Sequence, residues 1–484
     1  MNRSLEASRA WVDEGTSLCR KAIADLDERI ARMPSALDGW SRAHVVAHLA
    51  ANADAVGNLI TWARTGVETP MYSSPQQRAE DIEAGSVRSL EDLRDWFDRS
   101  ADRLAAAMDG LTADQCCTRI LNDFGLLDEV LALGVRPESM VMKDAVDGRE
   151  LTRLDLGDLE ARYGFPYVVI HRSDLHAVLL HGACRLGVEL VTNAAAVAYS
   201  TGDDFAEVAF ADRSVHRADV VIAADGLHSV ARGLLVDDAP VSSAYVAYRG
   251  AVPIEAVRDD GVSETDVVVR VGPGCHFVQY PLRGGAMFNQ VAVFESPKAL
   301  AGEDDWGAPD ELDAAFERTS EAVQDGLRHM WTDRWWRMYD RDPISTWVHG
   351  RIALLGDAAH PPLQYMAQGA VMAIEDGWVL GQHVARLTDR IGRVDWDGAL
   401  TAYEAVRPEH CRRVVTTARD WGKLWHLDGE ERVQRNAVLT PRQVDDYAWI
   451  DWIYGLTALF PQDEPEIYPQ TTLAEAAAGV SVPV

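Results

Sequence analysis

The chain has 484 residues, of which 47% are hydrophobic and 25% charged, as in a globular protein with more than one domain. Its 46 Lys and Arg residues face 76 Asp and Glu residues, and the formal net charge of -30 argues against nucleic acid and anionic membranes as partners. No apolar run is long enough to span a membrane, and the 6 cysteines lack metal-binding spacing, so we expect a cytoplasmic protein with free thiols.

The first part of the chain, up to about residue 113, shows only helical patterns. Apolar residues recur at spacings of three and four over Leu5 to Arg32, Ser41 to Ala63 and Leu90 to Met108. Several amphipathic helices without strands predict an up-and-down bundle.

Two histidines, His44 and His48, lie four residues apart on the second of these helices, so both face the same side. Such a pair can bind a metal ion with a third ligand, and it is also an ordinary arrangement on a helix surface. The surrounding string GWSRAHVVAHLAANADAVGNLITWARTGVETPMYSS resembles the mycothiol-dependent maleylpyruvate isomerases, which are helical bundles related to the DinB family. The resemblance covers about residues 5 to 113 and implies that His48 is a zinc ligand.

That family takes its other two zinc ligands, a Glu and a His, from a later helix with a motif like R-E-V-W-x-H-A-V-D-L. This chain has no such string. Because one protein ligand cannot hold Zn²⁺ against water, we expect the zinc site to be incomplete. A zinc- and thiol-dependent isomerase stays an alternative hypothesis for the activity.

From about Gln115 onwards, short apolar runs alternate with helical patterns. Four runs are typical of buried strands in an α/β sheet: Tyr167 to Ile170, Val188 to Val191, Val220 to Ala224 and Ile352 to Leu355. Four others predict an antiparallel sheet: Tyr245 to Val252, Val267 to Val271, His276 to Pro281 and Gln290 to Phe294. Long helical patterns resume at Ala370.

Three strand ends carry residues suited to a nucleotide cofactor. One strand ends in Gly356 and Asp357, and Gly369 opens a helical pattern soon afterwards. An acid at a strand end can accept a hydrogen bond from a sugar hydroxyl, and a helix N-terminus offers free N–H groups to phosphate. Asp225 ends the string ADVVIAAD, and Arg172 follows YVVI, where it can meet a pyrophosphate. An acid at one strand end is typical of a cap or turn, but three strand ends of this kind in this order favour a cofactor site.

Together these strings resemble the single-component flavoprotein aromatic hydroxylases, which have the p-hydroxybenzoate hydroxylase fold. SSAYVAYRG, GCHFVQYPLRGG, NQVAVFESP, DRWWRMYDRDPI, GDAAHPPLQY and WGKLWHLDG look like the 3-hydroxybenzoate 6-hydroxylases of that family, over about Thr118 to Tyr454. The resemblance implies an FAD cofactor. The residues expected to bind it are Arg172, Asp225, Gly356, Asp357 and Gly369.

The string CHFVQYP places His276 and Tyr280 on one face of a strand, because side chains alternate along a strand. A phenol is hydroxylated more easily as its phenolate, and a hydrogen-bonded histidine or tyrosine can take its proton. Gln364 can orient the ring or its hydroxyl. A lone His-x-x-x-Tyr is typical of sheet packing, whereas the resemblance implies that His276, Tyr280 and Gln364 form the active site.

The resemblance also implies the reaction. NADH would reduce the FAD, O₂ would form a flavin hydroperoxide, and the activated ring of a small aromatic acid would take the terminal oxygen. The expected conversion is 3-hydroxybenzoate to gentisate. Salicylate or a related phenol stays open as substrate, and a homodimer is one alternative for the oligomeric state.

The start of the hydroxylase domain is missing from this sequence. The family begins with a strand, a G-x-G-x-x-G turn, a helix and a second strand that ends in an acid for the ribose. No G-x-G-x-x-G occurs here, and the likeness starts only at CTRILNDFGLLDEVL. Loss of the central strand unpairs its neighbours, so a catalytically impaired fusion of both parts is a further hypothesis.

We therefore predict a fusion of two parts. A truncated helical bundle covers residues 1–115, an FAD-binding and substrate domain covers residues 116–405, and a C-terminal helical region covers residues 406–484. The second part has the α/β and β fold of the aromatic hydroxylases without its N-terminal βαβ unit. Ring opening of gentisate gives maleylpyruvate, so we hypothesise that an in-frame deletion joined two genes of one pathway.

Overall fold

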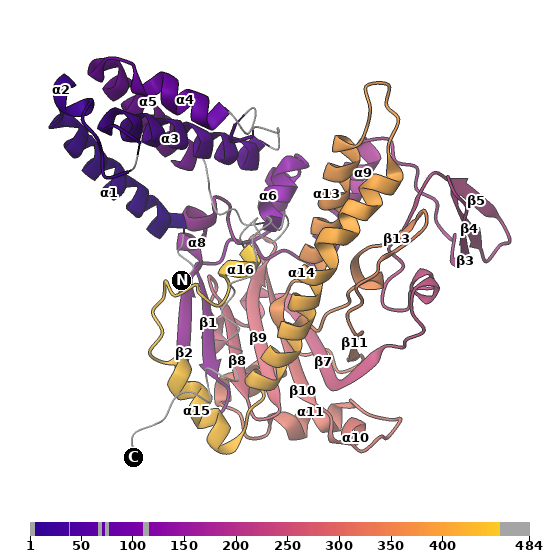
Figure 1. Cartoon of the computed structure of the whole chain (residues 1–484). Helices are drawn as coiled ribbons and strands as arrows, with labels where there is room; N and C mark the ends of the chain where they lie inside the picture. The colour runs from indigo at the N-terminus through magenta and orange to yellow at the C-terminus, as the bar shows by residue number, and fades with distance from the viewer. Residues whose placement is uncertain (1–4, 38, 66–69, 73–76, 110–115, 455–484) are drawn as a thin grey trace. The chain divides into compact units, whose positions relative to one another are not determined.

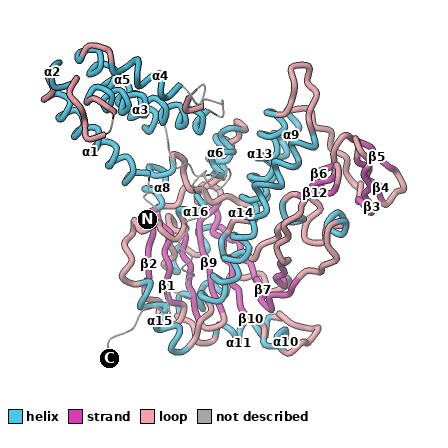
Figure 2. Tube along the Cα trace, in the orientation of Figure 1, coloured by secondary structure: helices cyan, strands magenta, loops and turns pink. Residues whose placement is uncertain are grey.

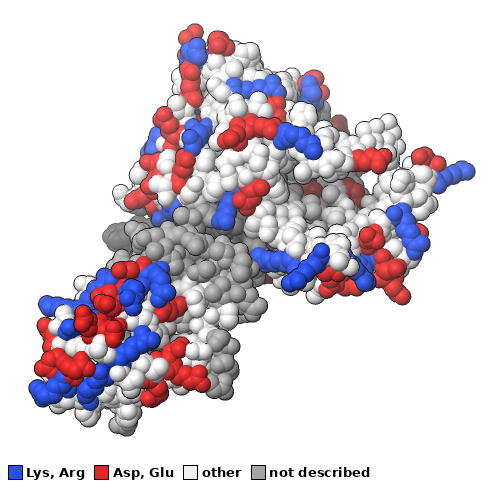
Figure 3. All heavy atoms as spheres, turned by 90° about the horizontal axis from the view of Figure 1, so that it is seen from above, with Lys and Arg blue, Asp and Glu red and all other residues white. Residues whose placement is uncertain are grey.

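The computed structural model describes residues 5–37, 39–65, 70–72, 77–109 and 116–454 (Figure 1). The chain forms two compact units that divide between Ala113 and Asp114. Among the described residues, the helices include none with the length and apolar character needed to cross a bilayer. On the face shown in Figure 3, Lys and Arg side chains are interspersed with Asp and Glu side chains.

In the N-terminal unit, the described residues form helices and no strand, as the sequence predicts. The expected first helix is interrupted, because the carboxylate of Asp27 accepts a hydrogen bond of 2.6 Å from the N–H of Ile30 and starts a new helix. Buried residues such as Val46 and Leu93 form its core. Its helices are α1 (Leu5–Ala24), α2 (Glu28–Ala31), α3 (Arg42–Thr65), α4 (Gln77–Ser86) and α5 (Leu90–Asp109).

The second unit contains a seven-stranded sheet with the order β11-β7-β10-β9-β8-β1-β2 (Figure 2). The predicted antiparallel pairing is confirmed, because β7, β10, β9 and β8 are antiparallel neighbours. The strands β1 and β2 were not predicted, and β1 is parallel to β8. The seven strands are β1 (Ser139–Asp144), β2 (Glu150–Asp155), β7 (Val241–Pro253), β8 (Val267–Gly272), β9 (Cys275–Leu282), β10 (Met287–Glu295) and β11 (Trp336–Asp340).

Helices cover both faces of this sheet. The long helix α14 packs on one face, where Ala418 and Trp425 contact Val269 and its neighbours. On the opposite face, Phe277 and Phe294 pack against α11 and α12. The helices of this unit are α6 (Cys116–Asp123), α7 (Leu127–Leu133), α8 (Leu156–Tyr163), α9 (Arg172–Arg185), α10 (Pro297–Leu300), α11 (Pro309–Phe316), α12 (Glu321–Leu327), α13 (Gly369–Arg386), α14 (Trp396–Trp425), α15 (Gly429–Leu439) and α16 (Asp451–Tyr454).

Two small sheets complete this unit. One has the order β12-β13-β6, in which β13 and β6 are parallel as predicted and β6 is an edge strand. The other is an antiparallel sheet of β3, β4 and β5. Their strands are β3 (Ala196–Thr201), β4 (Ala206–Phe210), β5 (Val215–Ala218), β6 (Val221–Ala223), β12 (Val348–His349) and β13 (Ile352–Leu354).

Two predicted buried strands are wrong. Tyr167 to Ile170 forms only an isolated bridge, in which Val169 pairs with Val135. Val188 to Val191 has no regular structure, and its apolar side chains Val188 and Val191 are 54% and 63% exposed. An apolar run becomes a buried strand only when neighbours pair with it, and the β12-β13-β6 sheet ends at β6.

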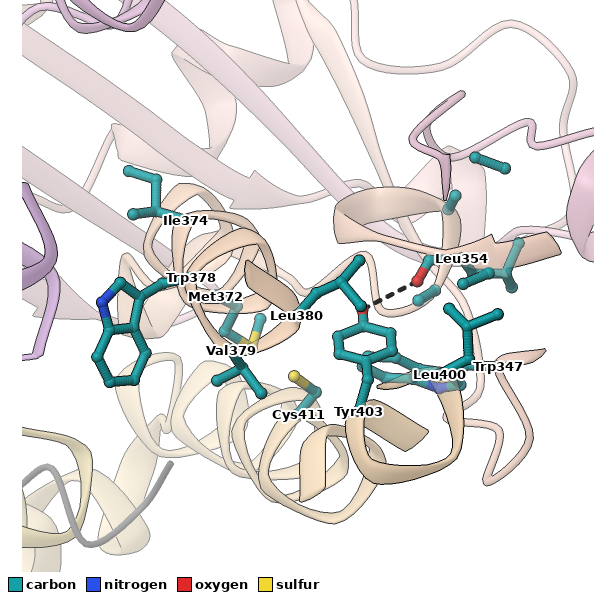
Figure 4. Packing of buried hydrophobic residues seen from close by; sticks show 14 of the residues in the cluster. Trp347, Leu354, Met372, Ile374, Trp378, Val379, Leu380, Leu400, Tyr403 and Cys411 are labelled. Carbon is teal, nitrogen blue, oxygen red and sulfur yellow. Dashed lines mark hydrogen bonds between the residues drawn. The ribbon is translucent and has the colours of Figure 1, made fainter. Parts of the chain in front are cut away.

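The described C-terminal residues, up to Tyr454, are mainly helical as expected. The helix α14 runs without a break from Trp396 to Trp425, so the predicted domain boundary at residue 405 falls inside it. The boundary expected at residue 115 lies outside the described residues. Figure 4 shows how α13 and α14 pack through Met372, Val379 and Cys411, and how the hydroxyl of Tyr403 donates to the carbonyl of Leu354 at the end of β13.

Candidate active site

The turn after β13 holds the first group of predicted site residues. Gly356 has a φ of 62°, and a Cβ there would lie 3.2 Å from the Cβ of Ala373 on α13, so the turn requires glycine. The next residue, Asp357, is exposed. Gly369 is the first residue of α13, and the N-cap position of this helix makes no side-chain hydrogen bond. The first N–H groups of α13 are therefore not capped by its N-cap side chain.

A buried polar network lies beneath this turn. The carboxylate of Asp376 on α13 accepts hydrogen bonds from the N–H of Gly356 at 2.9 Å, from Nε2 of His360 at 2.6 Å and from Nε of Arg407 at 2.7 Å. Burial alone would raise the pKa of Asp376, but His360 and Arg407 lower it to about 2. The carboxylate is therefore charged at neutral pH and fixes the turn.

The other two predicted cofactor residues have different surroundings. Asp225 follows β6 and is exposed, and its carboxylate accepts from the N–H of Val230 at 2.9 Å and from the hydroxyl of Tyr199 at 3.2 Å. This carboxylate therefore also closes a turn. Arg172 is the first residue of α9 and its side chain is exposed.

On the substrate side, the structure brings together His276 and Gln364. His276 lies on β9 and is 1% exposed, and its Nε2 lies 3.5 Å from Nε2 of Gln364 in the short helix Gln364–Met366. Burial lowers the pKa of His276 well below its usual value, and a positive charge on the neighbouring His426 would lower it further. The imidazole is therefore neutral at pH 7 and has a lone pair with which to accept a proton.

Tyr280 lies farther along β9, and no hydrogen bond or ring contact joins it to His276 among the described residues. Burial raises the pKa of Tyr280, and the positive charge of Arg249 on β7 opposes this rise. The predicted trio is therefore one contacting pair, with Tyr280 at a different position along the same strand face.

The turn and helix residues fit one half of an FAD molecule. A glycine-only turn, an exposed acid and an uncapped helix start suit the ribityl chain and a phosphate. For the adenosine half, the sequence has no G-x-G-x-x-G, and the parallel sheet ends at β6. The described residues therefore fit the flavin end of the cofactor, and they lack the usual phosphate loop.

The described residues around His48 do not fit a zinc ion. Burial and then Arg78 lower the pKa of His48, its Nδ1 is buried without a partner, and its ring contacts Trp40. Within the described ranges, the one group of three side chains that could ligate a metal is His360, Asp376 and Cys411, in the other unit. The guanidinium of Arg407 donates to both Asp376 and Cys411, so we interpret that group as an ion-pair network.

Two contributors to the site were not predicted from the sequence. His426, just after α14, places its Nε2 at 2.7 Å from Nδ1 of His276. Arg407 in the middle of α14 fixes the carboxylate beneath the flavin turn. The string around His426 looks like the hydroxylases, but a contact across 150 residues leaves no local signal. Arg407 could be noticed only as a charge on the helix face that carries the buried residues Tyr403 and Cys411.

Two protein families match the sequence. Residues 98–418 match the family described as FAD binding domain. Residues 12–136 match the family described as mycothiol maleylpyruvate isomerase N-terminal domain. The two matches together reproduce the order of parts that the sequence resemblance implies, and they overlap around the junction of the two units.

Characterised relatives match the second part. A 3-hydroxybenzoate 6-hydroxylase of Polaromonas naphthalenivorans (strain CJ2) is 35% identical over 334 residues, which are 68% of this chain and 82% of the relative. A 3-amino-4-hydroxybenzoate 2-monooxygenase of Streptomyces cremeus is 37% identical over 379 residues, which are 77% of this chain and 91% of the relative.

A solved structure has the same fold. The HpxO protein of Klebsiella pneumoniae, solved as a complex with FAD and uric acid, superposes with a TM-score of 0.60 at 26% identity and covers 68% of this chain and 83% of its own. The expected hydroxylase fold is thus confirmed.

Proposed function

This chain belongs to the family of FAD-binding aromatic monooxygenases, with a maleylpyruvate isomerase N-terminal domain fused in front, and we propose that it hydroxylates a phenolic acid with NADH and O₂. The substrate that we propose is 3-hydroxybenzoate, which would give gentisate. The names of the relatives support this choice, because both act on hydroxybenzoates.

One observation carries the proposal. The segment from Gly356 to Gly369 begins at the glycine turn that fits the flavin, passes through Gln364 and ends at the start of α13. Gln364 in the middle of this segment lies 3.5 Å from the buried base His276. A single loop thus carries both the proposed cofactor turn and a residue next to the group that would take the phenol proton.

The roles of the residues follow from their chemistry. Bound FAD supplies the reduced centre that activates O₂. The exposed carboxylate of Asp357 would accept from a ribityl hydroxyl, and the start of α13 at Gly369 would face a phosphate. His276 would take the phenol proton at Nε2 while the amide of Gln364 orients the hydroxyl.

A direct assay tests the proposal. The purified chain with added FAD should oxidise NADH faster when 3-hydroxybenzoate is present, and chromatography should identify gentisate in proportion to the NADH consumed. His276→Asn should lower kcat by about 10²-fold to 10⁴-fold, the usual contribution of a positioned base. Stimulated NADH oxidation that yields only hydrogen peroxide, with no hydroxylated product, would contradict the proposal.

Location and assembly belong to the same proposal. We place the activity in the cytoplasm, where NADH is available, and the free thiols of Cys19, Cys117, Cys184, Cys275 and Cys411 agree with a reducing compartment. We also propose a homodimer. Light scattering on the purified chain would contradict this part if it gave a monomer mass.

A further inference from the structure

Two buried histidines meet beside the proposed substrate site. Nδ1 of His276 lies 2.7 Å from Nε2 of His426, and the stacked rings have centroids 5.0 Å apart. The two side chains are 1% and 9% exposed, so the contact lies away from bulk water. The carbonyl of His426 also accepts from the N–H of Gly274 at 3.0 Å, in the turn that precedes β9. The backbone therefore fixes this ring next to its partner.

The hydrogen bonds decide which nitrogen of each ring carries the proton. Nε2 of Gln364 lies 3.5 Å from Nε2 of His276, and because an amide nitrogen only donates, this histidine nitrogen accepts. The proton of His276 is therefore on Nδ1, which donates to Nε2 of His426. The proton of His426 is then on its own Nδ1, a buried atom without a partner. An unpartnered buried donor has a free-energy cost, which points to a role beyond packing.

We propose that His426 is a positioning residue that accepts the Nδ1–H hydrogen bond of His276 and stabilises the cation that His276 becomes on taking the phenol proton. The proposal rests on the proposed hydroxylase function. In the step, the O–H bond of the phenol breaks, its electron pair stays on the phenolate oxygen, and an N–H bond forms at Nε2 of His276. The hydrogen bond from the cationic ring to His426 is then charge-assisted and stronger than before.

The surroundings keep His426 neutral and therefore able to accept. Burial and then the charge of Arg435 lower the pKa of His426 to about 3. No carboxylate is hydrogen-bonded to either ring in the described part of the chain, so the imidazole of His426 occupies the place that a carboxylate has beside many catalytic histidines. The other titratable groups packed around the pair are Tyr245 on β7, Glu295 at the end of β10, Tyr365 in the Gln364–Met366 helix and Arg435 on α15.

The ionisation of a bound coloured phenol tests this inference. The probe is 3-hydroxy-4-nitrobenzoate, whose phenolate absorbs visible light, titrated with pH on the flavin-loaded chain and read as a difference spectrum. His426→Phe should raise the apparent pKa of the bound probe by about one unit, a tenfold loss of ionisation, because the cation on His276 loses its acceptor. His426→Asn, whose amide oxygen can accept, should restore part of that loss.

Two matched variants complete the design. Tyr245→Phe keeps the ring that contacts His426 at a centroid distance of 4.7 Å and should leave the pKa of the bound probe unchanged. His276→Asn should abolish any lowering of that pKa by the protein. If His426→Phe does not fold, His426→Leu takes its place, and because Leu has no acceptor it should raise the pKa of the bound probe in the same way.

The outcomes separate this inference from the proposed function. A wild-type chain that binds the probe without lowering its pKa would overturn the function itself at the step of phenol activation. A lowered pKa that depends on His276, and that is the same in wild type and in the His426 variants, would overturn only the role of His426. A raised pKa in His426→Phe, with partial recovery in His426→Asn, supports the inference.

Discussion

Arg407 on α14 donates through Nε to the carboxylate of Asp376 on α13 at 2.7 Å, and both side chains are fully buried. The same carboxylate accepts from the N–H of Gly356. The turn that fits the flavin is thus held by an ion pair between two helices in the protein interior.

Replacement of Arg407 tests how much this ion pair contributes to the free energy of unfolding. Arg407→Leu should lower the free energy of unfolding by about 3–5 kcal/mol, because it removes the guanidinium partner of the buried Asp376 and leaves only His360 beside this carboxylate. Urea denaturation measures the loss. Lys423→Ala on the same helix removes an ion pair with Asp420 whose side chains are 73% and 54% exposed, and it should cost about 0–1 kcal/mol. Equal effects of the two substitutions would contradict the interpretation.

Acid should destabilise the second unit through Asp144. Burial alone would raise its pKa, but hydrogen bonds from Arg432, Asn436 and two backbone N–H groups lower it to about 2, from the ordinary 3.8. A lowered carboxyl pKa gives stability that is complete above the unfolded value and is lost as the pH falls from about 4 to about 2. The contribution is about 2 kcal/mol, and Asp144→Asn should flatten the stability profile in that range, measured by thermal unfolding at each pH.

Two glycines offer a paired test of the flavin turn. Gly356→Ala should weaken flavin binding and lower stability by about 1 kcal/mol or more, because Gly356 has a φ of 62° and its Cβ would crowd Ala373. Gly377→Ala, inside α13 with nothing within 4 Å of its Cβ, should instead stabilise by about 0.5–1 kcal/mol. Flavin fluorescence titration and thermal unfolding distinguish them, and a neutral Gly356→Ala would show that the turn tolerates a side chain.

The missing phosphate loop predicts an unusual flavin preference. The described residues fit the ribityl and flavin half of the cofactor and include no phosphate loop for the adenosine half. FMN and FAD should therefore bind with affinities within about tenfold of each other. Titration of the flavin-free chain with each cofactor, followed by fluorescence quenching, gives both dissociation constants. A preference for FAD of a thousandfold would mean that some other part of the chain binds the adenosine half.

The zinc content of the purified chain tests whether the isomerase-like N-terminal unit binds a metal ion. Since His48 has no second or third ligand among the described residues, the purified chain should contain well below one zinc per molecule. Elemental analysis after dialysis gives the ratio. His44→Ala is the control for disturbance of the helix, because the ring of His44 is already hydrogen-bonded to the hydroxyl of Ser41. A full equivalent of zinc that disappears in His48→Ala and persists in His44→Ala would show a working metal site.

The sequence predicts secondary structure correctly where the determining residues are close together in the chain. Alternation and β-branched runs identify β8, β9 and β10. The glycine turn at Gly356 is readable because Asp357 follows it directly and the helical pattern that opens at Gly369 comes next along the chain. The run Val188 to Val191 has the same composition and is not a strand. Its structure depends on neighbouring strands, and residue composition contains no information on their presence.

In the candidate site, too, some residues are predicted from the sequence and others are positioned only by the tertiary structure. The resemblance to the hydroxylases implies a role for Gln364, and the structure places its amide 3.5 Å from His276. The contact between His276 and His426 joins residues 150 positions apart, so it depends on where α14 ends over the sheet. Tyr280 shares a strand face with His276, but the length of the strand separates the two side chains.

The loop from Gly356 to Gly369 would couple the affinity for flavin to the affinity for the phenol. One end of the loop fits the cofactor, and Gln364 within it lies 3.5 Å from His276, the proposed proton acceptor. If the phenol orders this loop, it tightens flavin binding, and reciprocity requires the flavin to tighten phenol binding by the same factor. A chain with an incomplete cofactor site would then hold its flavin best while the aromatic acid is present, so the supply of substrate would set how much of the protein is loaded.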